Sequence, residues 1–520
     1  MAIAEHSLRR EVTSWGSFSW GYSDVGADIF VALGLVFGAA AGASNVSFLF
    51  AGCVYVLVGL AYTELAATYP VAGGGQYFVM RGLGDMLGFV AGWAVLLDFT
   101  IDIVLFAWAC VGYISNLVPS LSGTGHPVAH FFAILFLIVA LAILNILGVR
   151  ESTAFNEWIT GMDILSETSI LFFGFLFTFD PSLLVHTMQA HWPSPFDLMK
   201  GTSLAIISFV GLESISQAAQ ETRRPAQVIP RTSVSLILTV LIFALAYSNL
   251  ALGMHPWHAV PPDAQGHAQP LYAFLGNAEN NDKAVAILAG DIPYFGLLAA
   301  AYVPILGAIL VLISSNSGVF GASRIAYAMS KERLLPSLFA RVHGGFRTPA
   351  IAIATFCGIG VLVHIFAALQ GDAGLNFLGD LYAFGAALSY SLVFLALIAL
   401  RLKDPLAPRR FKTPLNIAMR WKGQDVLFPI VGVLGFLGIT AILIFVLLTH
   451  EIGRIAGPSW IVLGFAGYLI YRRRKRLPLF QSRPQDWHAV QVAILRDAGE
   501  LELMDEYIQS TRKQRAKEPT

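Results

Sequence analysis

Three pairs of acidic residues interrupt long apolar stretches of the sequence, and the members of each pair stand four residues apart. The pairs are Asp24 with Asp28, Asp98 with Asp102, and Asp163 with Glu167. On a helix this spacing places both carboxyl groups on one face. No lysine or arginine stands at a matching position to neutralise them. Carboxyl groups in such surroundings bind a cation, bind a proton, or meet water near a helix end.

Several of these acidic residues also have a structural interpretation. Asp24 lies near the predicted edge of its span, where capping a helix is an equal alternative to a site role. Asp102 and Glu167 can act as hydrogen-bonded partners that share a proton with their neighbours. Glu213, in another apolar stretch, can instead bond a loop at the inner end of its helix. We expect a function for the three that lie deeper, which are Asp28, Asp98 and Asp163.

The composition identifies the solvent around these residues. Of 520 residues 56% are hydrophobic and only 13% charged, with a mean hydropathy of +0.66, which one water-soluble core cannot hide. Long apolar runs without strict alternation favour helices over a membrane barrel. Acidic and basic residues balance at 33 each, so the net charge indicates no nucleic-acid partner. The three cysteines lack metal-ligand spacing, and we expect neither a metal site nor a cofactor.

The apolar runs predict an all-α integral membrane protein of about twelve transmembrane helices. The predicted spans are 21–42, 45–68, 84–117, 127–148, 157–180, 198–219, 230–254, 291–328, 348–369, 376–401, 426–449 and 458–475. Basic residues gather in alternate loops, while the opposite loops hold little beyond Lys283 and Arg454. This asymmetry predicts that both termini face the cytoplasm. Residues 476–520 follow as a cytoplasmic tail with one short amphipathic helix from Trp487 to Tyr507, lying on the membrane or on the protein.

Small residues are concentrated in the first and sixth spans. The first contains Gly21, Gly26, Gly34, Gly38 and Gly42, and the sixth contains Gly201 and Gly211 beside three serines. Close helix packing accounts for any one of them. At the start of two five-helix halves they have a second meaning, because interrupted helices there place backbone groups around a midplane substrate.

Four separate stretches resemble the amino acid, polyamine and organocation superfamily of permeases. They are Gly26-Ala27-Asp28-Ile29-Phe30-Val31, the inner-loop motif from Tyr62-Thr63-Glu64-Leu65 through Tyr69-Pro70-Val71-Ala72-Gly73-Gly74-Gly75-Gln76-Tyr77 to Arg81-Gly82-Leu83-Gly84, Ser208-Phe209-Val210-Gly211-Leu212-Glu213 with Glu221 and Arg224-Pro225, and Ser323-Arg324 to Leu335-Pro336. The resemblance covers roughly residues 15 to 450. It implies a LeuT-like fold with a 5+5 inverted repeat and two C-terminal helices. Residues 1–475 then form the transporter domain, with repeats at 21–180 and 198–401 and the added helices at 426–475.

Two departures from the family pattern bear on the substrate. Amino acid permeases offer backbone amides from a glycine-rich bend to the substrate carboxylate, whereas this chain has Asp28 where the second glycine is expected. A carboxylate there repels another unless it is protonated or a cation lies between them. One proton-coupled branch carries its coupling lysine in the fifth span, and ungapped matching from Asn156 puts Asp163 at that place. Aspartate can carry a proton there if desolvation raises its affinity for one.

Potassium importers of the same superfamily offer a competing resemblance. Their Ser-Asp pair and their Leu-x-Asp-aromatic stretch are similar to Ser23-Asp24 and Leu97-Asp98-Phe99, but Val31 stands where they place a tyrosine. Outside transport, a polytopic membrane enzyme would need convergent reactive residues, for which the sequence offers only His364 and His450 near helix ends. A nutrient sensor that binds without transport is a further alternative.

We therefore expect a secondary transporter, proton-coupled or exchanging, that moves an amino acid or organic amine across a cell (inner or plasma) membrane and is not an enzyme. Its partners would be the lipid bilayer, a small-molecule substrate (amino acid, amine or monovalent cation) and a coupling proton. The expected substrate-binding residues are Ser23, Asp24, Gly26, Ala27, Asp28, Ile29, Asp98, Asp102, Ser208, Phe209, Val210 and Gly211. Asp163 would carry the coupling proton with Glu167 as its relay, and Phe209 would act as a gate.

Overall fold

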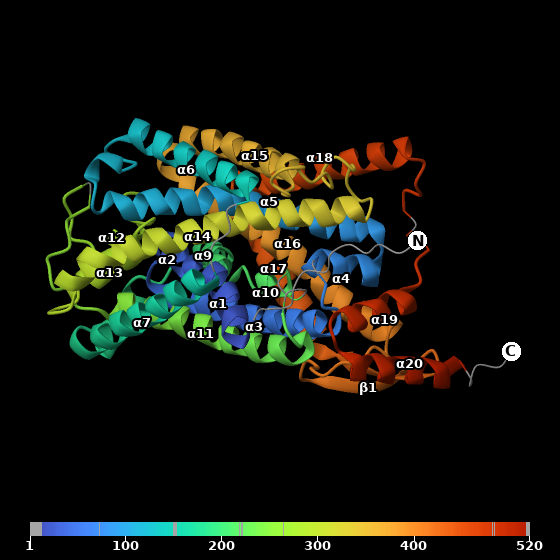
Figure 1. The fold of residues 1–520 in the computed structure, drawn as a ribbon. Coiled ribbons are helices and arrows are strands. Elements are labelled where there is room, and N and C mark those ends of the chain that lie inside the picture. Colours follow the sequence, from blue (N-terminus) through green and yellow to red (C-terminus); the bar gives the residue numbers. More distant parts are fainter. Residues whose placement is uncertain are drawn as a thin grey trace.

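A computed structural model describes residues 13–515, apart from 72, 149–152, 218, 220, 221, 264, 481 and 483. Ala72 and Glu221 of the motifs quoted above lie outside the described residues. The described chain is a bundle of long helices with a small hairpin and two short helices at one end (Figure 1). We call this end, where α19 and α20 lie, the tail end, and the opposite end, where α12 and α13 lie, the far end.

The helices fall into two halves and a C-terminal part. The first half comprises α1 (Ser14–Val25), η1 (Gly26–Asp28), α2 (Ile29–Ala40), η2 (Ala41–Ala43), α3 (Ser44–Thr68), α4 (Gly74–Leu83), α5 (Asp85–Ser115), η3 (Pro119–Leu121), α6 (Pro127–Leu147), α7 (Thr153–Phe177) and α8 (Pro181–Ala190). The second comprises α9 (Pro195–Ala205), η4 (Ile206–Phe209), α10 (Glu213–Gln217), α11 (Pro225–Gly253), α12 (Leu271–Gly276), α13 (Ala284–Gly290), α14 (Gly296–Lys331), α15 (Ala350–Leu369), η6 (Gly371–Ala373) and α16 (Gly374–Lys403). The C-terminal part comprises β1 (Asn416–Trp421), β2 (Gln424–Pro429), α17 (Ile430–Thr449), α18 (Gly453–Arg474), α19 (Trp487–Asp497) and α20 (Leu501–Arg515).

Ten segments among the described residues are long and apolar enough to cross a membrane. The first, Ser14–Thr68, is 55 residues long and crosses twice, because contacts with α11 show that the chain reverses within it. Along α3, residues with higher numbers contact residues of α11 with lower numbers: Asn45 contacts Asn249, and Gly59 lies against Ile237. The start of α1 lies near the start of α11, where Ser17 contacts Thr232. The other predicted span outside the ten is α18, which contains Pro458 and ends in Arg472–Arg474. The prediction of an all-α membrane bundle is confirmed.

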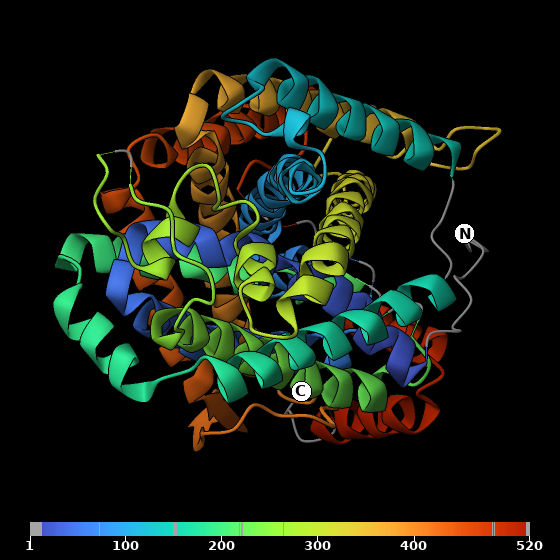
Figure 2. The same cartoon turned by 90° about the vertical axis from the view of Figure 1, so that its left-hand side faces the viewer.

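The centre of the bundle is the packing of α5 against α14. A window of α5 is 94% buried, the highest share of any span among the described residues. A Cβ atom at Gly318 would lie 2.7 Å from the Asp102 side chain, so the two backbones can approach only because glycine stands there. Ser315 Oγ donates to the Ile103 carbonyl at 2.8 Å across the same contact. Figure 2 shows these two helices nearly end-on, surrounded by the others.

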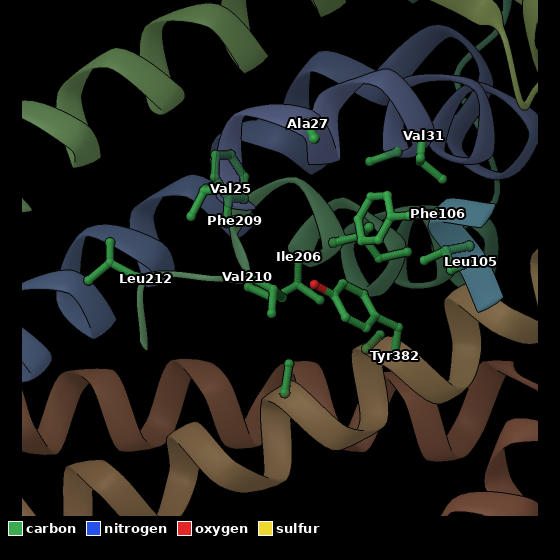
Figure 3. Close-up of a cluster of buried hydrophobic side chains, with 14 of the residues drawn as sticks. Val25, Ala27, Val31, Leu105, Phe106, Ile206, Phe209, Val210, Leu212 and Tyr382 are labelled. Carbon is green, nitrogen blue, oxygen red and sulfur yellow. The ribbon is translucent and has the colours of Figure 1, made fainter. Parts of the chain in front are cut away.

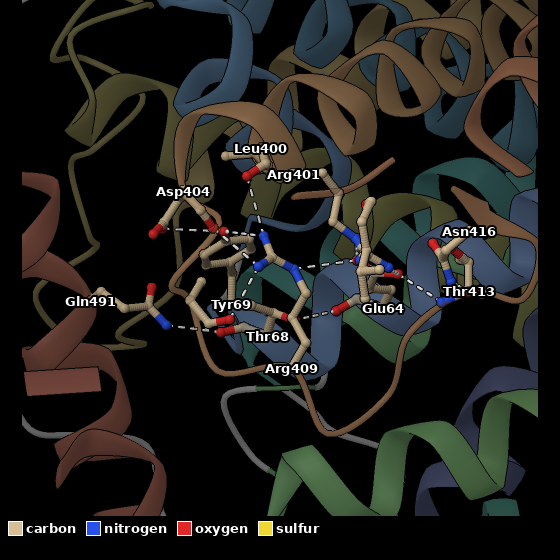
Figure 4. Close-up of polar contacts among 12 residues, drawn as sticks. Glu64, Thr68, Tyr69, Leu400, Arg401, Asp404, Arg409, Thr413, Asn416 and Gln491 are labelled. Atoms are coloured by element: carbon tan, nitrogen blue, oxygen red, sulfur yellow. Dashed lines mark hydrogen bonds and ion pairs between the residues drawn. The ribbon is translucent and has the colours of Figure 1, made fainter. Parts of the chain in front are cut away.

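The inner-loop motif forms a buried ion network at the tail end (Figure 4). Glu64 accepts from Arg401 Nε at 2.5 Å and from the Thr413 backbone N–H at 2.8 Å, and Arg409 Nε lies 3.3 Å from the same carboxylate. Its side chain is 0% exposed and that of Arg401 is 4% exposed. Because each charge is paired and bonded, the network joins α3 to α16 and to the loop after it.

The C-terminal region contains two features that the sequence analysis did not predict. Residues 416–429 form a two-stranded antiparallel hairpin, in which Trp421 pairs with Gln424 and the turn residues Lys422 and Gly423 both have positive φ. The single amphipathic helix predicted in the tail is two helices, α19 and α20, separated near Gly499.

The tail helices dock on the bundle. Gln491 of α19 accepts from Arg81 Nη1 at 2.7 Å and donates to the Thr68 carbonyl at 2.9 Å. Glu500 accepts from the Ala226 N–H at 3.2 Å. The tail thus contacts the tail-end residues of α3, α4 and α11.

The Glu64 network leads to a stability prediction. Among the described residues Glu64 is the one acidic partner of the buried Arg401 and Arg409. We therefore expect Glu64→Gln to lose about 3 to 5 kcal/mol in unfolding free energy. The thermal unfolding midpoint of the purified protein in detergent micelles measures this. Glu502→Gln is the matched control, because its pair with Arg410 is exposed at the glutamate (89%) and should contribute about 0 to 1 kcal/mol. Equal midpoints for the two variants would contradict the assignment.

Candidate functional site

The two interrupted helices meet in the middle of the bundle. The first is α1–η1–α2 and the second is α9–η4–α10, and η1 contacts η4 directly. Figure 3 shows apolar side chains from both interruptions, including Val25 and Phe209, gathered with Tyr382 of α16 and Phe106 of α5. The two interruptions therefore lie within a cluster of buried apolar side chains.

The two interruptions differ in kind. Residues 25–29 keep right-handed helical dihedral angles, so η1 is a local tightening of one continuous helix. The second helix is broken: Val210 is extended (φ −88°, ψ 159°), and Gly211 has a φ of +105°. A Cβ atom at Gly211 would lie 3.0 Å from Asp24 Oδ2. Glycine is therefore required at this position by both its dihedral angle and its neighbour.

Five buried carboxyl groups surround the interruptions, and we call them the central carboxyl cluster. They are Asp24 (3% exposed), Asp28 (1%), Asp98 (1%), Asp102 (2%) and Glu213 (2%). Asp28 interacts electrostatically with each of the other four. Like charges this close cannot all be ionised without neutralisation, so protons or a bound positive group must be shared among them.

The members of the cluster differ in how well they are satisfied. Ser214 Oγ makes a short hydrogen bond to Asp24, and Tyr390 Oη donates to Glu213 Oε2 at 2.7 Å. The backbone N–H of Gly211 also donates to Glu213, at 3.3 Å. In contrast, both carboxylate oxygens of Asp28 are buried without a hydrogen-bond partner.

Further unused acceptors lie in the same region. Asp98 Oδ1, Asp102 Oδ1 and Ser208 Oγ are buried and have no partner. Asp24 is not a helix cap, since it lies within α1, whose N-cap is Thr13. Ser23 is engaged in helix packing, donating to the Trp20 carbonyl at 3.1 Å and accepting from Asn156 Nδ2 at 3.2 Å. The unpartnered oxygens of Asp28, Ser208, Asp98 and Asp102 thus belong to η1, η4 and α5.

The remaining predicted site residues are buried around the two interruptions. Gly26, Ala27 and Ile29 are buried in η1 and the first turn of α2, and Val210 is buried at the break. The Phe209 ring is fully buried and stacks on Tyr55, with centroids 4.9 Å apart. Phe106 and Tyr382 make an edge contact with centroids 6.2 Å apart. The side chains around the interruptions are thus largely apolar and aromatic, and they are buried from solvent.

The third acidic pair lies on α7, separate from the central cluster. Asp163 and Glu167 are each 0% exposed. Tyr22 Oη of α1 donates to Glu167 Oε2 at 2.5 Å, while both oxygens of Asp163 lack a partner. Tyr247 of α11 interacts electrostatically with both carboxyl groups. The pair on α7 therefore lies where α7 meets α1 and α11, and α1 is the helix that continues into the central carboxyl cluster.

Several important residues were missed by the sequence analysis. Tyr22, Tyr390 and Ser214 bind site carboxyl groups, yet each lies in an apolar helix where a hydroxyl gives no signal of its partner. Their one sequence signal is that buried tyrosine and serine hydroxyls need partners. Among the described residues, no three or more His, Cys, Asp or Glu side chains are grouped to hold a metal ion.

A family model described as "Amino acid permease" matches residues 14–471. The branched-chain amino acid permease BcaP of Bacillus subtilis (strain 168) is 26% identical and is aligned over 90% of this chain and 94% of that protein. The methylthioribose transporter of the same organism is 27% identical over 75% and 80% of the two chains. Cationic amino acid transporter 4 of Mus musculus is 28% identical over 78% and 62%.

The break at Gly211 leads to a second prediction. Gly211→Ala forces alanine into a left-handed conformation against Asp24, so we expect a lower thermal unfolding midpoint, with a cost of about 1 to 3 kcal/mol. Gly358→Ala in α15 is the matched control, because no atom lies within 4 Å of an added Cβ there. A Gly211→Ala protein as stable as the control would show that the break does not depend on glycine.

Proposed function

The chain belongs to the amino acid permease family, and we propose that it is a secondary transporter that carries an amino acid or organic amine across the membrane. The observation that carries this proposal is Asp28. It stands at the contact between the two interrupted helices, is 1% exposed, and leaves both carboxylate oxygens without a partner. A buried carboxylate left in this way is stabilised by a positive ligand or a proton.

The surroundings of Asp28 favour an ammonium group as the ligand. Asp98 Oδ1 and Asp102 Oδ1 are additional unused acceptors on α5. An ammonium group has three N–H donors and one positive charge, so it satisfies several acceptors and partly neutralises the cluster. The aromatic walls formed by Phe106, Phe209 and Tyr382 suit an apolar substrate body.

Coupling to protons is proposed for the α7 pair. Asp163 has no hydrogen-bond partner and Glu167 is held by Tyr22, which is six residues before Asp28 on the same interrupted helix. A change in the protonation of Asp163 would alter the charge beside Tyr22 and thereby bias the position of that helix. Movement of α1 would then link proton binding at α7 to substrate binding at Asp28.

The alternatives have weaker support. The potassium-importer interpretation rests on the two short matches given above, and nothing in the comparisons adds to it. For the enzyme alternative, the structure offers one Ser-His-Asp set joined by hydrogen bonds. His450 Nε2 lies 2.6 Å from Ser203 Oγ, and His450 Nδ1 contacts Asp380. Ser203, His450 and Asp380 are 0%, 1% and 7% exposed. A nucleophile must reach its substrate, and these side chains are buried. We therefore assign the Ser203–His450–Asp380 set a structural role, in which it anchors α9 on α16 and α17.

The orientation is also a proposal. The tail end carries the basic residues Arg81, Arg401 and Arg409 and the docked helices α19 and α20, and we place it in the cytoplasm. The far end then faces outward from a plasma or inner membrane. This places the substrate site between the two faces, closed from both.

The first functional prediction concerns Asp28. In proteoliposomes screened with labelled amino acids, polyamines and potassium, we expect uptake of an amino acid or amine. Asp28→Asn keeps the shape but removes the charge, so uptake should fall at least about tenfold. Asp28→Gly should shift preference toward zwitterions, because the repulsion of a substrate carboxylate is removed.

The matched control for Asp28 is Asp505→Asn, which removes an exposed aspartate from α20 and should leave uptake unchanged. Unchanged amino acid and amine uptake in Asp28→Asn would refute the binding role. Uptake of potassium alone would favour the importer alternative.

The second functional prediction concerns coupling. Asp163→Asn cannot release a proton, so accumulation driven by a pH gradient should be lost while exchange of internal for external substrate persists. Glu157→Gln removes a half-buried carboxyl from the same helix and should retain the gradient dependence. Gradient-driven accumulation that survives in Asp163→Asn would exclude this residue as the proton carrier.

A further inference from the structure

A second polar pocket lies at the far end, away from the central carboxyl cluster. It has a volume of about 230 Å³ and is bordered by the end of α5, the start of α6, the segment between α12 and α13, and the end of α15. Four ionisable side chains form its inner wall: His130, His364, Asp282 and Lys283. Nothing in the proposed transport mechanism uses these residues.

The two histidines present unused acceptors. His130 Nδ1 lies 2.9 Å from the Leu121 carbonyl, and His364 Nε2 lies 3.1 Å from the Phe131 carbonyl. A carbonyl oxygen only accepts, so each of these nitrogens carries a hydrogen. In the neutral ring the other nitrogen is then an acceptor. Those nitrogens, His130 Nε2 and His364 Nδ1, are buried and have no partner.

Asp282 adds a third acceptor. Its side chain is buried beside Gly112, where a Cβ atom would lie 2.2 Å from Asp282 Oδ2. The other oxygen, Oδ1, has no partner. Burial raises the pKa of Asp282 to about 6, although the charge of Lys283 acts in the opposite direction. The carboxyl group is therefore desolvated and incompletely satisfied.

The remaining wall residues define the complementary ligand. Lys283 is the one basic residue of the lining, and its Nζ donates to Ser115 Oγ at 3.3 Å. The Trp108 ring makes an edge contact with each histidine ring, with centroid distances of 5.1 Å to His130 and 6.0 Å to His364. Glu279 and Asp372 are exposed members of the lining, so the approach to the pocket is negative.

We propose that this pocket is a second binding site for an amino acid, with its ammonium group on Asp282, His130 and His364 and its carboxylate on Lys283. The proposal rests on the amino acid transport proposed above and extends it to the far face. Three buried acceptors and an aromatic ring match an ammonium group. Adjacent opposite charges at Asp282 and Lys283 match a zwitterion. In the proposed orientation the pocket holds substrate at the external surface before it reaches the central site.

Equilibrium binding of labelled L-leucine and L-arginine to the purified full chain in nanodiscs tests the proposal. We expect two equivalents of at least one probe per wild-type chain. Asp282→Asn removes the charge, so the affinity for one of the two bound equivalents should fall at least about tenfold. His364→Phe keeps a ring beside Phe131 and Trp108 but removes the acceptor His364 Nδ1. The affinity for the same bound equivalent should fall in this variant. His267→Ala, at an exposed histidine of the far-end loop, is the control and should retain both.

Asp28→Asn separates this inference from the proposed function. The second site is supported if the Asp28→Asn variant still binds a probe and the double variant, with Asp28→Asn and Asp282→Asn together, does not. This holds whether or not Asp28 serves transport. A single wild-type equivalent that disappears in Asp28→Asn alone would overturn the second site while leaving the central one in place. Two equivalents that are unaffected by both Asp282→Asn and His364→Phe would also overturn it, as would a wild type that binds neither probe.

Discussion

The structure depends on the cost of keeping carboxyl groups away from water. Five carboxyl side chains in the central cluster are at most 3% exposed, and none of them forms a salt bridge shown in the described chain. A charge in such surroundings needs a counter-charge, a proton or several hydrogen bonds. The bundle supplies hydrogen bonds to Asp24 and Glu213 but none to Asp28. This difference separates Asp24 and Glu213, which bond neighbouring segments, from Asp28, for which we propose a ligand.

The tail end shows the opposite solution to the same problem. Glu64 is equally buried, but Arg401, Arg409 and the Thr413 N–H satisfy it. A fully paired charge binds its own chain and has no remaining capacity for a ligand. The helices α19 and α20 extend this closed arrangement through Gln491 and Glu500. The protein thus has a well-satisfied polar end and a poorly satisfied polar centre, which is the distribution expected of a molecule that binds positive groups midway through a membrane.

Glycine determines how closely the parts of the centre approach. Gly211 permits the break in the second interrupted helix beside Asp24, and Gly318 permits α14 to lie on α5 next to Asp102. The first interrupted helix contains Gly26 but remains helical, and it carries Asp28 at the position where the family pattern has a second glycine. The two helices therefore contribute different chemistry, a side-chain acceptor from one and an open backbone turn from the other.

The sequence by itself predicted the membrane spans, the acidic pairs and the two spans in which small residues gather. These features are local: apolar length, i, i+4 spacing and clustered glycines are readable along one segment. Tertiary structure alone decided which carboxyl groups are satisfied, because the partners are distant in sequence: Tyr22 is 145 residues from Glu167, and Tyr390 is 177 from Glu213. It also decided that α1 is tightened while α9–η4–α10 is broken, and that His130, Asp282 and His364 border one pocket. A hydroxyl or imidazole in an apolar helix looks the same in the sequence whether it meets a partner or not, since only packing brings the two together.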